Sequence, residues 1–223
     1  MLANKRCLIL AIAILLSTSP IPSHSASDEW RLEKTTDGIN IYSREYPSSD
    51  VREIKATTQL TSSIGSVVAV IEDIPSSARL NSIIAEARIE SPRNNGRYQV
   101  YNHIAMPWPV KDRDISICRE LYLDNETSII TIIDLACAGT PLKENLIRMT
   151  TFRQQWRLTP SETGTIKIEF TAHSEPGGPI PRWIINKMST DVPYQILQNL
   201  EALSQLDPYV NSRIDETRFN RLN

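Results

Sequence analysis

Apolar and polar residues alternate along most of the chain between residues 30 and 173, which is typical of half-buried β-strands. Clusters of turn-forming residues, such as Asp37-Gly38, separate the alternating stretches. Because short turns join consecutive strands, we expect an antiparallel sheet. The pattern predicts strands over Trp30–Lys34, Ile39–Tyr46, Val51–Leu60, Glu86–Ser91, Arg97–Met106, Asp114–Leu123, Ser128–Ala138, Ile147–Thr159 and Thr165–His173.

Helical periodicity occurs in three places. Ser63–Glu72 has the pattern of a short helix with a serine at its start, and Ser76–Leu80 adds one further turn. From Pro179 onward, apolar residues recur at spacings of four and three, which predicts a helix of about 27 residues and about 40 Å. We expect Pro193 to kink it and Asp207-Pro208 to end it. The apolar positions are Ile180, Ile184, Met188, Val192, Ile196, Leu200, Leu203 and Leu206.

These elements predict an α+β fold in which a long, curved antiparallel sheet is closed by one long C-terminal helix. One helix cannot cover so many strands, so the inner face of the sheet must either fill with side chains or enclose a cavity. We assign residues 26–206 to this domain and expect residues 207–223 to form a polar, loose tail.

The N-terminal segment has the composition of a secretory signal peptide. Lys5 and Arg6 precede the apolar run CLILAIAILL, and small residues follow near a cleavage site at about Ser25 or Ala26. The apolar run is shorter than the roughly 20 residues that span a bilayer. We therefore expect residues 1–25 to be removed and the mature protein to be periplasmic or secreted; an uncleaved membrane anchor is the alternative.

The charge and the residue composition argue against a nucleic acid partner and against a metal site. The chain has 24 Lys and Arg against 26 Asp and Glu, and no basic stripe, so we expect no nucleic acid partner. Outside the leader, only His103 and His173 remain, and there is neither a CxxC nor an HExxH motif. The chain therefore has too few histidine and cysteine ligands for a typical metal site, and we expect no metal and no cofactor. We also expect a monomer.

Cys118 and Cys137 lie on the two arms of one predicted hairpin. If the hairpin register centres between Thr127 and Ser128, the two residues are directly opposite and can form a disulfide in an exported protein. A register centred on Asn125–Glu126 would separate them and leave two buried thiols.

The stretch PWPVKDRD joins two predicted strands by an unusual corner. Its two prolines restrict the backbone on either side of Trp108, so that the tryptophan can place apolar bulk at a rim. Arg113 and Asp114 are adjacent and should face opposite ways on the following strand. We expect them to bond to separate backbone or charged partners that hold the start of the strand, rather than to a ligand.

Four segments in order resemble the START (steroidogenic-acute-regulatory-related lipid-transfer) family in its secreted bacterial form. They are Trp30 with DGINIYSREY, then YQVYNHIAMPWPVKDRD, LIRMTTFRQQWRLTP and EPGGPIPRWIIN, and they extend from about Asp28 to Leu206. The resemblance implies the helix-grip fold, which is an antiparallel sheet wrapped on a long C-terminal helix with a lipid tunnel between them. It implies binding of a lipid or another hydrophobic small molecule, possible transient contact with a membrane, and no catalysis.

Arg119 is the sharpest candidate for a ligand-binding residue. By alternation it shares a face with Ile115, Ile117 and Leu121, and an arginine on an apolar face needs a buried partner or a ligand. In relatives of the resembled family, an acidic residue on the preceding strand can pair with a cavity arginine. That position falls at His103 here, so this chain departs from the family pattern.

Two hypotheses follow for the charge of Arg119. In the first, the arginine lacks an anion and accepts an anionic or carbonyl-bearing head group, so that Arg119→Leu abolishes selective binding while the domain still folds. In the second, Glu169, Glu144 or the C-terminal helix supplies the anion.

The remaining candidates lie near the long helix. Gly177-Gly178-Pro179 is similar to the hinge of the gripping helix in the family. We expect Trp183, Ile184 and Met188 to face the sheet, where they pack in the core or line the tunnel. Trp156 is expected to be a core residue or a ligand platform.

We infer a non-catalytic carrier of a hydrophobic ligand. The alternatives are an enzyme that uses His103 or a buried acid as base on a hydrophobic substrate, and a scaffold whose rim binds a protein partner. No serine or cysteine lies in a recognisable nucleophile elbow, which disfavours the enzyme.

Overall fold

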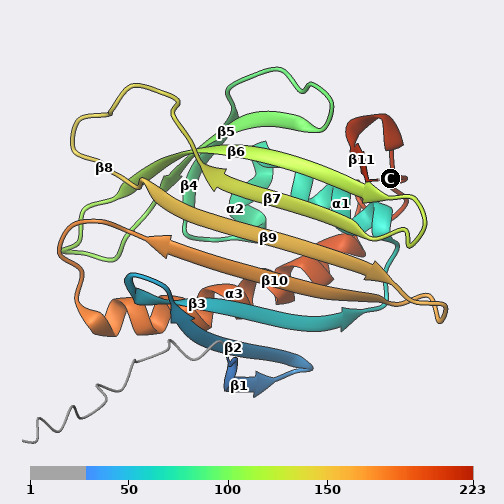
Figure 1. Ribbon diagram of the computed structural model, residues 1–223, viewed down its shortest axis with the longest axis horizontal. Helices are drawn as coiled ribbons and strands as arrows, with labels where there is room; N and C mark the ends of the chain where they lie inside the picture. The colour runs from blue at the N-terminus through green and yellow to red at the C-terminus, as the bar shows by residue number, and fades with distance from the viewer. Residues whose placement is uncertain (1–28, 223) are drawn as a thin grey trace, which may run out of the picture.

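The computed structural model describes residues 29–222, so the expected signal peptide, residues 1–25, lies outside the described residues. One sheet of 11 strands dominates the fold (Figure 1). The strands are β1 (Arg31–Thr36), β2 (Ile39–Tyr46), β3 (Ser49–Leu60), β4 (Ile84–Ile89), β5 (Arg97–Ile104), β6 (Arg113–Asp124), β7 (Ile130–Ala136), β8 (Ile147–Arg148), β9 (Thr151–Pro160), β10 (Ile166–Glu175) and β11 (Asn220–Leu222). The helices are α1 (Ile64–Glu72), α2 (Ser77–Leu80) and α3 (Arg182–Ser204), with short 3₁₀ turns at Ile74–Ser76 and Glu216–Arg218. Among the helices of residues 29–222, none combines the length and apolar character needed to cross a membrane.

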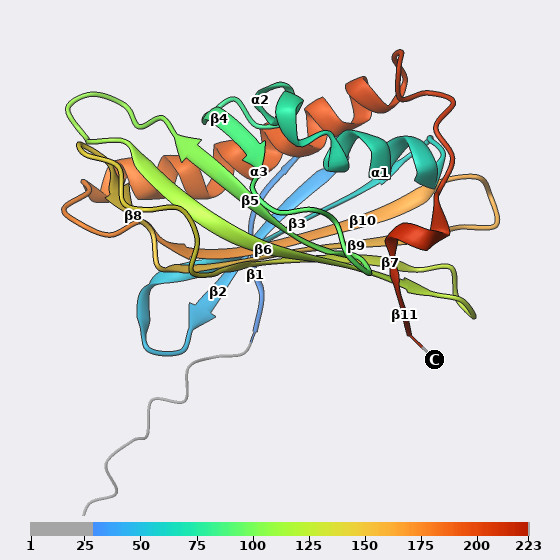
Figure 2. The same cartoon turned by 90° about the horizontal axis from the view of Figure 1, so that it is seen from above.

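The strand order is β1-β2-β3-β10-β9-β7-β6-β5-β4, and every pair along it is antiparallel. The N-terminal strands β1, β2 and β3 form one edge of the sheet. They join the remaining strands where β3 pairs with β10, with Thr58 opposite Ile168. Figure 2 shows the curved sheet with α1, α2 and α3 all on one side. The predicted α+β class, a curved antiparallel sheet wrapped around a long C-terminal helix, is confirmed.

The inner face of the sheet carries the core. Alternate strand residues point to this face, as the sequence pattern predicts, and many are β-branched side chains that fit a pleated surface. Helices α1 and α3 close over them with Val67, Ile196, Leu197 and Leu200. Buried residues of the strands include Ile39, Ile41, Ile54, Ile115, Ile117, Ile130, Ile132, Leu158, Ile166, Ile168 and Phe170.

Helix α1 begins and ends at local signals. The Ser63 hydroxyl caps it by accepting a 3.0 Å hydrogen bond from the backbone N–H of Ser66. Pro75 follows closely and belongs to the next 3₁₀ turn. The last residue of α1 is Glu72, which is 6% exposed, so the end of the helix places a buried carboxylate at the edge of the core.

Helix α3 starts three residues later than the periodicity predicts, at Arg182 rather than Pro179. The reason is Pro181, which takes the N-cap position with an extended backbone and disfavours helical geometry at Ile180. Pro193 lies inside the helix and is buried.

The prediction of a loose C-terminal tail is wrong. Tyr209 and Phe219 are buried, and the carbonyl of Val210 accepts a 2.9 Å hydrogen bond from Ser66 Oγ. Strand β11 then pairs in parallel with the end of β6, with Arg221 opposite Leu123. Two buried aromatic residues and a short strand thus hold this mostly polar segment against the domain.

Candidate functional site

A cavity of about 220 Å³ lies between the inner face of the sheet and the first half of α3. Most of its walls are apolar. The sheet contributes Ile54, Val100, Ile115, Ile117, Trp156 and Phe170, and α3 contributes Ile185, Met188, Val192 and Ile196. Arg113 and Arg119, which both line it, are six residues apart on β6, a span of about 20 Å along the strand. We call the Arg119 end the inner end and the Arg113 end the hinge end.

A charged cluster closes the inner end. Arg119 and Asp134 are opposite each other on β6 and β7, and the guanidinium donates twice to the carboxylate, Nε to Oδ1 at 2.7 Å and Nη2 to Oδ2 at 2.8 Å. Its Nη1 donates to Glu72 Oε1 at 3.1 Å and to the carbonyl of Ile71 at 3.0 Å. Gln154 completes the shell by donating to Asp134 Oδ2 at 3.0 Å. Arg119 is therefore paired with two carboxylates.

Glu72 is the centre of a wider network. It accepts from the Tyr98 hydroxyl at 2.6 Å, from Arg93, and from Arg218 of the C-terminal segment at 2.9 Å. Burial alone raises the pKa of Glu72, but Arg119, Tyr98 and Arg93 outweigh it and hold the pKa below its ordinary value. The carboxylate is thus stabilised in its charged form.

The pKa of Arg119 responds to the same groups. Burial by itself lowers it, and Asp134, Tyr98 and Glu72 together raise it well above its ordinary value. The arginine remains charged, and its charge is balanced inside the protein.

Both sequence hypotheses about Arg119 need correction. Its anions come from Asp134 and Glu72, not from Glu169, Glu144 or the C-terminal helix. His103 is not placed to pair with Arg119, since Arg119 stands opposite Tyr98 on β5 and His103 stands opposite Asp114. His103 is not among the cavity-lining residues and instead pairs through Nε2 with Asp112 Oδ2 at 2.9 Å.

Two polar atoms of the lining are buried without a protein hydrogen-bond partner among residues 29–222. They are the Trp156 indole nitrogen Nε1 and the Asn102 carbonyl oxygen Oδ1. One is a donor and the other an acceptor. Such atoms are rare in folded proteins because each carries a desolvation cost, and they are places where a ligand atom can improve the energy. Trp156 therefore belongs to the cavity as well as to the core, while Asn102 was missed by the sequence reasoning.

The hinge end is held by Arg113. Its Nε donates to the carbonyl of Pro176 at 3.1 Å and its Nη2 to that of Gly177 at 2.8 Å, and it also contacts the carbonyl of Lys111. Gly177 and Gly178 both have φ of 64°, a left-handed conformation that favours glycine. The segment before α3 is thus tied to the start of β6.

Asp114 points to the opposite side of the sheet and accepts two hydrogen bonds from Arg148, at 2.8 and 2.9 Å. The expectation that Arg113 and Asp114 bond to separate partners is confirmed.

The predicted helix residues separate into different environments. Met188 lines the cavity and also borders a neighbouring hollow between α3 and the loop 105–107. Ile184 is buried and borders only this hollow. Trp183 does not face the sheet: it is 62% exposed and borders the same hollow. Trp108 is 90% exposed and projects from the loop before β6.

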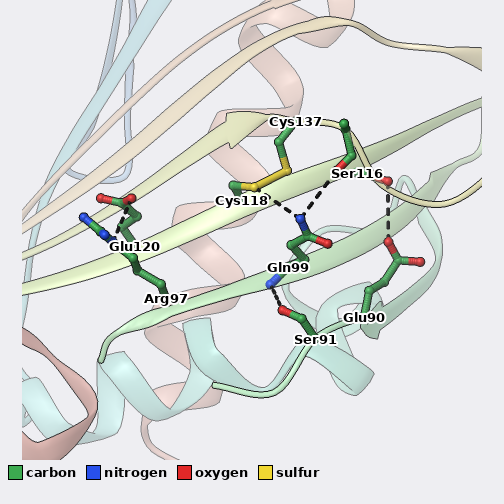
Figure 3. The surroundings of a disulfide bond; sticks show 9 residues. Glu90, Ser91, Arg97, Gln99, Ser116, Cys118, Glu120 and Cys137 are labelled. Atoms are coloured by element: carbon green, nitrogen blue, oxygen red, sulfur yellow. Dashed lines mark hydrogen bonds and ion pairs between the residues drawn. A yellow bond between two sulfur atoms is a disulfide. The ribbon is translucent and has the colours of Figure 1, made fainter. Parts of the chain in front are cut away.

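Cys118 and Cys137 form a disulfide, with their Cα atoms 5.7 Å apart (Figure 3). The hairpin register is neither of the two considered, because Cys118 stands opposite Leu135. Cys137 follows the end of β7 and reaches Cys118 diagonally, while its backbone N–H donates to the carbonyl of Ser116 at 3.0 Å. The bond lies on the outer side of the sheet, away from Arg119. Within residues 29–222, no cluster of three or more His, Cys, Asp or Glu side chains is arranged to hold a metal ion.

Comparison with known proteins identifies the fold. No family model matches the chain. An uncharacterized protein of Pseudomonas aeruginosa is 24% identical over 90% of this chain and 96% of its own length. The phosphatidylcholine transfer protein of Rattus norvegicus is 24% identical over 71% of this chain and 75% of its own length. A STAR-related lipid transfer protein from Xanthomonas axonopodis superposes with a TM-score of 0.73 at 25% identity, covering 80% of this chain and all of that crystallised fragment. The fold is therefore the helix-grip fold of START domains.

Proposed function

We propose that this protein binds a lipid or another hydrophobic small molecule in the cavity between the sheet and α3, and carries it without changing it chemically. The observation that carries the proposal is the apolar cavity itself, which lies between the inner face of the sheet and α3. The names of two of the similar proteins, which describe transfer of phosphatidylcholine and of lipid, support the same class of ligand.

Binding would be driven by removal of apolar surface from water, at about 0.8 kcal/mol for each buried CH₂ group. The cavity of about 220 Å³ lies below the roughly 300–1,000 Å³ of clefts that hold drug-sized ligands. A long-chain ligand therefore requires the walls to move apart. The segment with Gly177 and Gly178 suits such an opening, because it precedes α3 and α3 forms one wall.

The test is native mass spectrometry of the protein purified from the cells that make it, followed by solvent extraction of whatever is bound. We expect one adduct per chain with the mass of a lipid or similar apolar compound. A chain that is always empty and takes up no hydrophobic compound on incubation would contradict the carrier function. An extracted compound that changes mass on incubation with the protein would favour the enzymatic alternative, although His103, its proposed base, does not line the cavity.

Transfer also requires contact with a membrane, and the hinge end offers a surface for it. Trp108 and Trp183 are the most exposed tryptophans there, and Pro107 and Trp183 border one hollow. Tryptophan is enriched at membrane interfaces because its ring is apolar and its N–H is polar. We propose that this rim touches the membrane during loading and release.

The variant Trp108→Ala/Trp183→Ala is expected to slow transfer of a fluorescent lipid between vesicles several-fold, with the equilibrium occupancy unchanged because neither residue lines the cavity. Leu32→Ala is the matched control, since Leu32 is also exposed and apolar but lies on β1. Equal rates for the wild type and the tryptophan variant would remove the membrane-contact proposal.

We further propose that the protein works in the periplasm or outside the cell as a secreted bacterial START-like carrier. The N-terminal sequence with Lys5 and Arg6 ahead of an apolar run supports export. The Cys118–Cys137 disulfide supports the same compartment, because disulfides persist in oxidising surroundings. Size-exclusion chromatography with light scattering tests the accompanying expectation of a monomer.

A further inference from the structure

Trp156 occupies a distinctive position at the inner end of the cavity. It stands opposite Ile132 on β7 and Phe170 on β10, and its ring packs against the Phe170 ring with centroids 4.6 Å apart. The residue is 2% exposed, yet its indole N–H has no protein acceptor within the described part of the chain. A buried indole N–H normally has a hydrogen-bond partner, so this donor is free for a ligand atom.

The neighbouring polar groups form hydrogen bonds with one another and not with this donor. Gln154 lies two residues before Trp156, on the same face of β9, and donates to Asp134. Asp134 also accepts two hydrogen bonds from Arg119. The remaining terminal nitrogen of Arg119, Nη1, donates to Glu72. Trp156 is therefore the donor of the inner end that is left to recognise a ligand.

We propose that the Trp156 indole N–H donates a hydrogen bond to an uncharged oxygen at the inner end of the ligand, a hydroxyl or an ester carbonyl. The inference rests on the proposed ligand-binding function and specifies which ligands that site takes. Asn102 cannot serve the same ligand atom. It stands opposite Ile115, which is six residues along β6 toward the hinge end from Leu121, and Leu121 is in line with Trp156 through Ile132.

The charges of the inner end explain why the oxygen is uncharged. Arg119 is ion-paired with both Asp134 and Glu72, and Glu72 is also ion-paired with Arg93 and Arg218, so each charged group of the inner end already has a partner. A ligand carboxylate or ammonium placed beside this cluster would lose its hydration without gaining an unpaired counter-charge. A neutral oxygen needs only the single donor that Trp156 offers.

The experiment compares binding of four probes with the same twelve-carbon chain length: dodecanol, methyl dodecanoate, dodecane, and dodecanoate at a pH where the acid is ionised. Trp156→Phe keeps an aromatic ring and removes the N–H. We expect this variant to bind dodecanol and the methyl ester about five- to tenfold more weakly than the wild type, the effect of one net hydrogen bond, and dodecane equally well. Ionised dodecanoate should bind the wild type more weakly than the alcohol.

Phe170→Leu is the matched control, because it changes the packing of the same wall and should weaken all probes alike. In the wild type, the indole proton resonance assigned to Trp156 by its absence from Trp156→Phe should move downfield with dodecanol and not with dodecane. An unchanged ratio of alcohol to alkane affinity in Trp156→Phe would overturn the inference and leave the carrier function standing. Preferential binding of ionised dodecanoate would overturn the uncharged-oxygen assignment. Failure of the wild type to bind any probe would overturn the inference and the proposed function together.

Discussion

Replacing Arg119 by leucine is expected to destabilise the fold by about 3–5 kcal/mol, the usual cost of removing one partner from a buried ion pair. Arg119 is 7% exposed and holds Asp134 with two hydrogen bonds and Glu72 with one. Leucine fills part of the space but leaves Asp134 buried with only Gln154 as a donor. Urea unfolding at neutral pH measures the loss. The sequence-based expectation that this variant still folds assumed an arginine without an anion, and the structure gives Arg119 two.

Two controls separate the ion pair from other effects of the substitution. Arg119→Leu/Asp134→Leu removes both charges and should recover most of the lost stability, because two apolar side chains need no counter-charge. Arg97→Leu removes an exposed arginine that pairs with Glu120 at 3.0 Å, and should change the free energy of unfolding by less than about 1 kcal/mol. Equal destabilisation by Arg119→Leu and Arg97→Leu would show that the buried pair has no special role.

The pH dependence gives a further check on the same variant. In the wild type, the pKa of Glu72 is lowered: burial opposes this, and Arg119 is the strongest of the groups that bring it about. A carboxylate with a lowered folded-state pKa stabilises the protein above its unfolded pKa of about 4.3, and this stability is lost as the pH falls through the folded-state pKa. Arg119→Leu removes part of that contribution. The difference in stability between wild type and variant should thus be largest at neutral pH and shrink under acidic conditions.

The parts of the fold that depend on near neighbours could be predicted from the sequence. Strand alternation and turn residues located the hairpins, and Ser63 located the start of α1. The pairing of β3 with β10 joins segments about a hundred residues apart, and alternation does not encode which edges meet. The buried tail was missed for a related reason, because Tyr209 and Phe219 are single aromatic residues without periodicity.

In the candidate site too, the contacts of single residues depended on segments far apart in the sequence and could not be predicted from local patterns. The apolar neighbours of Arg119 correctly indicated a buried charge, but its partner depended on the hairpin register and on Glu72 from α1. Trp183 and Ile184 were both expected to face the sheet. Adjacent helical residues point about 100° apart, and only Ile184 is buried. The free Trp156 N–H could not be found from sequence, since it follows from what its neighbours bond to instead.

Reduction of the Cys118–Cys137 disulfide is expected to lower the free energy of unfolding by about 3 kcal/mol. The two cysteines are 19 residues apart, and a cross-link that closes a loop of about this size restricts the unfolded chain by roughly that amount. Urea unfolding with and without reductant measures the shift. Cys118→Ala/Cys137→Ala should match the reduced wild type and be insensitive to reductant. Identical transition midpoints for oxidised and reduced wild type would contradict the prediction.

The disulfide and the buried ion pair stabilise the same hairpin from opposite sides of the sheet. Arg119 and Asp134 face each other on the inner side, while Cys118, the neighbour of Arg119 on β6, is linked to Cys137 on the outer side. A slip of one residue between β6 and β7 would turn the charged side chains to the wrong face, so both features favour one register. Their contributions should therefore not add independently. Arg119→Leu should cost less in the reduced protein than in the oxidised one, because reduction frees the unfolded chain and also loosens the folded hairpin that aligns Arg119 with Asp134. A double-mutant cycle with Cys118→Ala/Cys137→Ala measures that coupling. If the losses of stability from removing the ion pair and the disulfide are strictly additive, the predicted coupling is contradicted, and each feature fixes the register without the other.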